Sequence, residues 1–163
     1  SALHPRLLYA NEGMQYEGDP YSSINEKPEA RDFLKHLLLF MLNSKDQTQA
    51  ERAANYWLYK NHEDRENLRR VGITRARPLI DAFREAHAPI SHYFCTGKKT
   101  GLRVMNKDAV IAIDVVNHFA RRGIPILSVH DSFIVARSHE DELRQVMHMT
   151  YKKHTKGFTC PIK

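Results

Sequence analysis

The sequence predicts an α+β fold that is mainly helical and contains one small antiparallel sheet. Apolar residues recur at helical spacing over most of the chain, which indicates a set of amphipathic helices. Two short runs of Ile, Val and Phe, at 126–129 and 133–135, flank a polar triplet and predict a tight β-hairpin. The 163 residues, 42% of them hydrophobic, are enough for one domain with a buried core.

Helices are expected to fill the first half of the chain, after a short helix at 3–10 and a loop at 11–27. Proline is favoured in the first turn of a helix, so Pro28 is expected to open one that runs to Leu42. Asp46 or Thr48 is expected to begin the next helix, and Thr74 is expected to cap a later one. The expected helices are 28–42, 46–61, 63–70 and 74–87.

A longer helix is expected at 106–119, where apolar residues cover most of the circumference and predict that the helix is buried. The basic turn at 96–101 precedes it and lacks the spacing of a P-loop, so it is either a solvated loop or a backbone contact to nucleic acid. The hairpin follows, with both strands expected to be buried. Residues 138–141 resemble a capping box and predict a final helix that runs to Lys153.

Aromatic and basic side chains in the middle of the chain leave two interpretations open. Tyr56, Trp57 and Tyr59 lie in one expected helix and are candidates for stacking on bases. A tryptophan among apolar residues at helical spacing is more often part of the core. Three arginines of the following helix are candidates for contact with phosphates or for a solvated helix face: Arg65, Arg69 and Arg70.

The charge and the cysteine content narrow the range of partners and compartments. A net charge of +6 and a pI near 9.4 favour a polyanionic partner, above all nucleic acid. Two cysteines, Cys95 and Cys160, form no disulfide framework and no CxxC metal pattern, which indicates thiols in a reducing, cytoplasmic setting. The chain shows no signal peptide and no apolar run of about 20 residues, so no membrane contact is expected.

The polar triplet of the hairpin places Asp131 where the chain is expected to turn. A carboxylate held between two strands and open on one side is what a catalytic metal requires. A surface turn that contains an aspartate is the alternative, because aspartate is common in turns.

Residues 126–136 resemble motif C, the palm-domain hairpin of single-subunit nucleic-acid polymerases. That superfamily includes the family A DNA polymerases and the phage-type RNA polymerases. The run His130-Asp131-Ser132-Phe133 is closer to the form that this motif takes in the RNA polymerases. The resemblance implies that Asp131 is the catalytic metal ligand and that His130 orients the primer end. It also implies a palm-like sheet around this hairpin.

Upstream, Arg31 and Lys35 are four residues apart in a segment that resembles motif B of the same superfamily. Residues at this spacing share one helix face, and two cations there can clamp a polyphosphate. A solvated stripe is the alternative. The resemblance implies that both residues bind the nucleoside triphosphate. The superfamily has an aromatic residue two turns after the lysine, and here that position is Asn43.

The first ten residues resemble the segment that follows the aspartate of motif A, which would lie immediately before Ser1. His4 then stands near the ribose, where the DNA-polymerase branch carries a glutamate. Residues 18–21 resemble the loop that follows motif A. The resemblance makes 1–163 one polymerase-like fragment, with fingers-like helices at about 28–95 and palm-like parts at 1–27 and 96–163. Candidate primer or template contacts are Arg6, Lys98, Lys99 and Asp108.

The expected function is template-directed nucleotidyl transfer with two Mg²⁺ ions, using nucleic acid and nucleoside triphosphates. One metal ligand would lie outside this chain, so the fragment alone is expected to bind nucleic acid and to polymerise poorly. The open edge of the sheet is expected to be covered by another chain or by the upstream segment. The alternative is a degenerate polymerase-like module, or an unrelated basic helical module, that binds nucleic acid without catalysis. A metallohydrolase is less favoured because HxxxH and HExxH patterns are absent.

Overall fold

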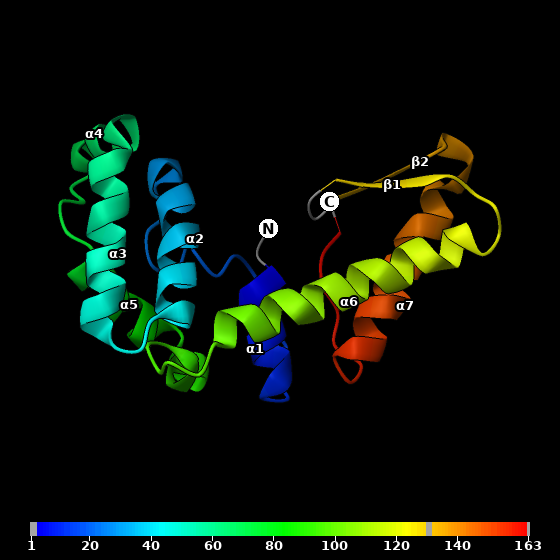
Figure 1. Cartoon of the computed structure of the whole chain (residues 1–163), viewed down its shortest axis with the longest axis horizontal. Helices are drawn as coiled ribbons and strands as arrows, with labels where there is room; N and C mark the ends of the chain where they lie inside the picture. Colours follow the sequence, from blue (N-terminus) through cyan, green and yellow to red (C-terminus); the bar gives the residue numbers. More distant parts are fainter. Residues whose placement is uncertain (1–2, 130–131, 163) are drawn as a thin grey trace. The chain divides into compact units, whose positions relative to one another are not determined.

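The computed structural model describes residues 3–129 and 132–162. Over these ranges the chain is mainly helical with one two-stranded antiparallel sheet, so the α+β class is confirmed, whereas the palm-like nature of the sheet stays a prediction. Contacts divide the chain into two compact units (Figure 1). We call Ser1–Glu17 with Val104–Lys163 the hairpin unit, and Gly18–Arg103 the helical unit. No helix within the described ranges is long and apolar enough to cross a membrane.

The helical unit contains four α-helices and a 3₁₀ helix, all within its described residues. Their bounds are α2 Pro28–Asn43, α3 Gln47–Lys60, α4 His62–Arg70, α5 Arg77–Ala86 and η1 Ala88–Tyr93. The two longest, α2 and α3, run side by side in Figure 1. Pro28 opens α2 as expected, and the Asp46 carboxylate caps α3 by accepting a hydrogen bond from the Gln49 amide at 2.7 Å. The buried face of α2 forms the centre of this unit: Ala30, Phe33, Leu34, Leu37, Leu38, Met41 and Leu42.

In the helical unit, the structure corrects the predicted start of α5 and agrees with a packing role for Trp57. The expected Thr74 cap is wrong, because α5 begins at Arg77 after Ala76. Had Thr74 been the cap, Pro78 would occupy the fourth helical position, where its missing N–H would leave the Thr74 carbonyl without a partner. Trp57 is half-buried, with its ring 5.6 Å from that of Phe33 (centroid to centroid), which agrees with a packing role.

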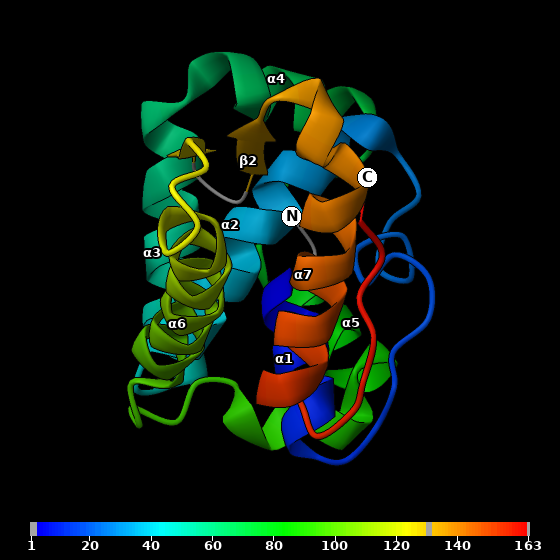
Figure 2. The same ribbon diagram turned by 90° about the vertical axis from the view of Figure 1, so that its right-hand side faces the viewer.

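The hairpin unit contains α1 Leu3–Asn11, β1 Ile126–Val129, β2 Ser132–Val135, η2 Arg137–His139 and α7 Glu140–His154. The long helix α6, Thr100–Ala120, begins in the helical unit and runs into this one. After α7 the chain turns back and runs beside that helix, as Figure 2 shows. Gln15 holds this returning segment: its side chain donates to the Thr159 carbonyl at 2.9 Å and accepts from the Thr159 amide at 3.0 Å.

The two strands pair antiparallel as expected, with Ile126 opposite Val135 and Val129 opposite Ser132, so that β2 begins one residue earlier than predicted. One face of the ribbon, which includes Ile126, Phe133 and Val135, packs on an apolar cluster formed by α6 and α7. We call this cluster the α6–α7 cluster; its buried members are Val115, Phe119, Leu143 and Val146. The other face is open, so the expectation that both strands are buried is wrong. A two-stranded ribbon packed on one side can bury only every second residue.

Helix α6 differs from the prediction in its start and its burial. It begins at Thr100 instead of residue 106, and it takes in the end of the basic turn. The expectation that it is buried all round is wrong, because one stripe is buried and the opposite residues are exposed. The buried stripe is Val104, Ile111, Val115 and Phe119; the exposed apolar residues are Leu102, Met105, Val110 and Ile113.

The start of α7 also differs from the prediction. Its cap position is His139, which makes no side-chain capping bond, so the expected capping box does not form. Residues Arg137–His139 instead form a 3₁₀ turn that leads into the helix. Three acidic residues in the first turn and three basic residues in the last turn suit the helix dipole: Glu140, Asp141 and Glu142, then Lys152, Lys153 and His154.

A buried histidine ties the loop before α2 to the end of α5. The His87 side chain is only 1% exposed, and its Nε2–H donates to the Pro20 carbonyl at 2.8 Å. Burial disfavours the charged ring and holds the pKa of His87 below its ordinary value of 6.5, while the bond to Pro20 acts in the opposite direction. This histidine is therefore neutral in the folded state at neutral pH.

This arrangement predicts that acid destabilises the fold through His87. The unfolded chain takes up the proton near pH 6.5 and the folded chain only at lower pH, so the free energy of unfolding falls as the pH drops below about 6.5. The slope contributed by one proton is at most about 1.4 kcal/mol per pH unit. Urea unfolding between pH 7 and pH 5 should show a shallower dependence in His87→Gln, which does not titrate. The exposed control His148→Gln should follow the wild type; equal slopes for all three proteins would contradict the assignment.

Candidate functional site

The hairpin carries the two residues predicted to act in catalysis. Its strands end at Val129 and resume at Ser132, so the two residues that join them in the sequence are His130 and Asp131. A two-residue link is the shortest common connection between antiparallel strands. His130 and Asp131 themselves lie outside the described residues, and their roles as primer contact and metal ligand stay predictions.

The surroundings of the hairpin supply a firm base for such a site. Phe119 of the α6–α7 cluster is fully buried, and the inward face of both strands packs against it and its neighbours. Elsewhere in the described ranges, no three His, Cys, Asp or Glu side chains gather where they could hold a metal ion. Asp131 is also the only acidic residue of segment 126–136. The Mg²⁺ prediction therefore rests on Asp131.

Arg31 of α2, a predicted triphosphate ligand, is held by the loop before that helix. Its guanidinium forms an ion pair with the Asp19 carboxylate and lies over the Tyr21 ring, 5.1 Å from the centroid. Burial raises the pKa of Tyr21 to about 12, against the opposing effect of Arg31, so the phenol stays neutral. This ion pair is not predicted from the sequence, although Asp19 belongs to the loop at 18–21 that resembles the one after motif A.

Lys35, one turn further along α2, has a carboxylate partner of its own. Its ammonium donates to the Asp32 carboxylate at 2.6 Å, and this hydrogen bond holds the pKa of Asp32 below its usual range. The two cations share one helix, as predicted, and each is balanced by a nearby acid. A phosphate group that binds here has to exchange with Asp19 and Asp32. Both ion pairs are partly exposed, so breaking them costs little free energy.

The structure brings Asn43 together with the basic turn of residues 96–101. Asn43 is the last residue of α2, and its side chain donates to the Leu39 carbonyl at 2.9 Å. It also lies against Gly101, where an added Cβ would meet the Asn43 amide and displace that side chain. The turn is fixed to the end of α2 by the Gly97 amide, which donates to the Ser44 carbonyl at 3.0 Å. Its two lysines, Lys98 and Lys99, are exposed.

The remaining predicted contacts belong to the hairpin unit. His4 of α1 lies 3.6 Å from the Asp108 carboxylate of α6, Nε2 to Oδ2, so these two candidates are neighbours. Arg6 is only 7% exposed; its guanidinium donates to the Tyr16 carbonyl and lies 5.9 Å from the centroid of the Tyr16 ring. Contact between Arg6 and a primer or template requires this packing to open, and the role stays a prediction.

The predicted residues thus form three local groups. Arg31 and Lys35 lie one turn apart on α2, and Asn43 adjoins the turn of Lys98 and Lys99, all within the helical unit. In the hairpin unit, His4 pairs with Asp108. Comparison of the chain with protein-family models, with curated proteins and with solved structures finds no match.

The Arg31–Asp19 pair yields a test of the triphosphate prediction. Arg31→Ala should weaken nucleotide binding by about 1.5–3 kcal/mol, because a charged hydrogen bond is lost. Asp19→Asn should strengthen it, because the carboxylate that competes for the guanidinium loses its charge. Both can be measured by isothermal titration with a nucleoside triphosphate and Mg²⁺.

Lys27→Ala serves as the matched control, since Lys27 is an exposed cation that precedes the same helix. Its effect should be small. If Asp19→Asn and Arg31→Ala both weakened binding, or neither changed it, Arg31 would be a structural partner of the loop and not a ligand of the triphosphate.

Proposed function

We propose that this chain is the core of a template-directed nucleotidyl transferase that extends a nucleic-acid primer from nucleoside triphosphates. The observation that carries the proposal is the antiparallel hairpin with Val129 opposite Ser132, because it leaves His130 and Asp131 as the link between its strands. Packing on the α6–α7 cluster supports it, since a metal ligand needs a rigid base.

In the proposed reaction, the primer 3′ oxygen attacks the α-phosphorus of the triphosphate and pyrophosphate leaves. Asp131 and a second carboxylate from motif A would hold Mg²⁺, which would neutralise the developing charge and lower the pKa of the primer hydroxyl. His130 donates a hydrogen bond that orients the primer end. Arg31 and Lys35 bind the β- and γ-phosphates after exchange with Asp19 and Asp32.

A second function, nucleic-acid binding without catalysis, is favoured by one observation. Arg31 is already paired with Asp19 and stacked on Tyr21, which is an arrangement that a structural arginine would also show. In that case the net charge of +6 serves backbone contact alone. Both functions involve binding of nucleic acid, but only nucleotidyl transfer requires Asp131.

Primer extension with Mg²⁺ and all nucleotides tests the proposal. The assay uses the 163-residue chain together with any residues encoded before Ser1, on DNA and RNA templates. Asp131→Asn should reduce extension below detection and leave primer–template affinity within about twofold, because only one charge changes. Asp141→Asn, an exposed acid in the first turn of α7, is the control and should extend normally.

The two functions give different outcomes in this assay. Extension that survives Asp131→Asn would overturn the assignment of the metal ligand. Binding that weakens steeply with salt, with no extension on any template, would favour the module that binds without catalysis.

A further inference from the structure

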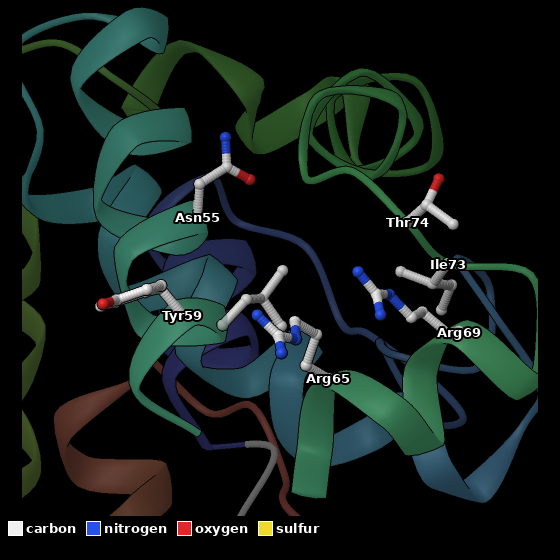
Figure 3. A pocket seen from close by; sticks show the side chains of 7 residues that line it. Asn55, Tyr59, Arg65, Arg69, Ile73 and Thr74 are labelled. Atoms are coloured by element: carbon white, nitrogen blue, oxygen red, sulfur yellow. The ribbon is translucent and has the colours of Figure 1, made fainter. Parts of the chain in front are cut away.

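A small pocket opens in the helical unit between α3, α4 and the segment that follows α4 (Figure 3). Its volume is about 140 Å³, well above the roughly 10–15 Å³ that a cavity needs to hold one water. Seven residues line it: Asn55, Leu58, Tyr59, Arg65, Arg69, Ile73 and Thr74. None of these is acidic, and the polar side chains among them supply mostly hydrogen-bond donors.

Local structure explains why these side chains converge. Asn55 and Tyr59 are four residues apart on α3, as are Arg65 and Arg69 on α4, so each pair shares a helix face. The chain then turns at Gly72, whose φ of 83° favours glycine, and the Ile73 amide donates to the Leu68 carbonyl at 2.8 Å. This turn brings Ile73 and Thr74 to the far wall of the pocket (Figure 3).

Arg65, which lines the pocket, has one side-chain donor without a hydrogen-bond partner in the part of the chain that the structure describes. Its Nε is buried and has no hydrogen-bond partner among the described residues. The Glu66 carboxylate is 3.9 Å from that atom, too far for a hydrogen bond. Another guanidinium nitrogen, Nη2, lies 2.8 Å from His62 Nδ1, which accepts from it. Buried donors are rarely left unsatisfied in native proteins, and a small shift of the Arg65 side chain would let this nitrogen bond an acceptor in the pocket.

The charge around the pocket favours an anion as that acceptor. Segment 62–77, from the start of α4 to the start of α5, contains five arginines against three acids, Glu63, Asp64 and Glu66. Arg69 donates to Glu66 at 2.8 Å, but both side chains are about half exposed, so this pair adds little stability and is readily exchanged. A phosphate suits two guanidinium groups four residues apart, because each can donate two parallel hydrogen bonds.

Exposed tyrosines beside the pocket favour a phosphate that belongs to a nucleic-acid strand. Tyr59 lines it and is 62% exposed, and Tyr56 on the same helix is 63% exposed. The Lys60 ammonium lies over the Tyr56 ring, 5.7 Å from its centroid. Basic side chains interleaved with exposed aromatic rings are typical of surfaces that bind single strands, in which bases are free to stack.

We propose that this pocket binds a backbone phosphate of single-stranded nucleic acid while Tyr59 stacks on an adjacent base. Arg65 and Arg69 bind the phosphate oxygens, with Asn55 and Thr74 as further donors. The inference does not depend on nucleotidyl transfer, since it uses no residue of the hairpin and none of the predicted triphosphate ligands.

Fluorescence anisotropy with a labelled 12-nucleotide thymidine oligomer tests the phosphate contact on the full chain. Arg69→Ala should weaken binding about tenfold or more and reduce the magnitude of the salt slope by about 0.7, the value for one phosphate contact to a single strand. Arg69 is half exposed, so the variant should fold, and its thermal midpoint should match that of the wild type. Arg121→Ala, an exposed arginine of the hairpin unit, removes the same charge and should leave the slope unchanged.

Variants of Tyr59 test the stacking. Tyr59→Ala should weaken binding by roughly 5- to 150-fold, the range of base–aromatic stacking, and Tyr59→Phe should restore it to within about twofold. An abasic oligomer of the same length should bind more weakly and should not distinguish the tyrosine variants.

Three outcomes would overturn the inference. An affinity and a salt slope of Arg69→Ala equal to those of Arg121→Ala would make the pocket irrelevant to binding. Duplex DNA with equal affinity and equal sensitivity to Tyr59→Ala would exclude a single-strand site. Competition by millimolar inorganic phosphate as strong as by the oligomer would make it a site for the free ion. Asp131→Asn should leave all of these measurements unchanged, so a failure here is distinguishable from a failure of the proposed catalysis.

Discussion

The contact between one face of the β-hairpin and the α6–α7 cluster is the constraint on which the candidate catalytic site depends. A two-stranded ribbon is marginally stable in water by itself, so the apolar packing of Phe133 and Val135 holds it. The same packing fixes the register, because a slip of one residue would expose Phe133 and turn Ile134 inward. With this register, His130 and Asp131 are the only residues between the strands. The outer face stays apolar, with Leu127 and Ile134 more than half exposed.

Two groups of cations in the helical unit differ in how they are balanced. Arg31 and Lys35 each have a carboxylate partner, so a phosphate binds there by exchange. In the second group, Arg69 is paired with Glu66, whereas Nε of Arg65 has no hydrogen-bond partner among the described residues, and no residue that lines the pocket is acidic. Arg31 and Lys35 therefore suit a ligand that binds and dissociates in each reaction cycle, such as a triphosphate that binds together with its own metal ion. The second group suits a strand held by several weak contacts along its length.

The sequence predicts those features that depend on short-range pattern. The extent of α2 follows from Pro28 and its apolar face, and the antiparallel hairpin follows from the apolar runs on either side of the polar triplet, although Ser132 of that triplet belongs to β2. It fails where packing decides: the exposed stripe of α6 depends on which faces find a partner. The start of α5 depends on Pro78, which has no N–H to bond the Thr74 carbonyl. Neither the Arg31–Asp19 pair nor the arginine pocket is visible in a linear pattern, since both join residues from separate segments.

The central claim, that Asp131 of the hairpin holds a divalent ion, can be tested directly by NMR with paramagnetic Mn²⁺ in place of Mg²⁺. The amide signals of Val129 and Ser132, the last pair of the ladder, report on this position. At low Mn²⁺ concentration the account predicts that they broaden before other signals and that Asp131→Asn removes the effect. Broadening confined to the acidic first turn of α7, or unchanged in Asp131→Asn, would contradict it.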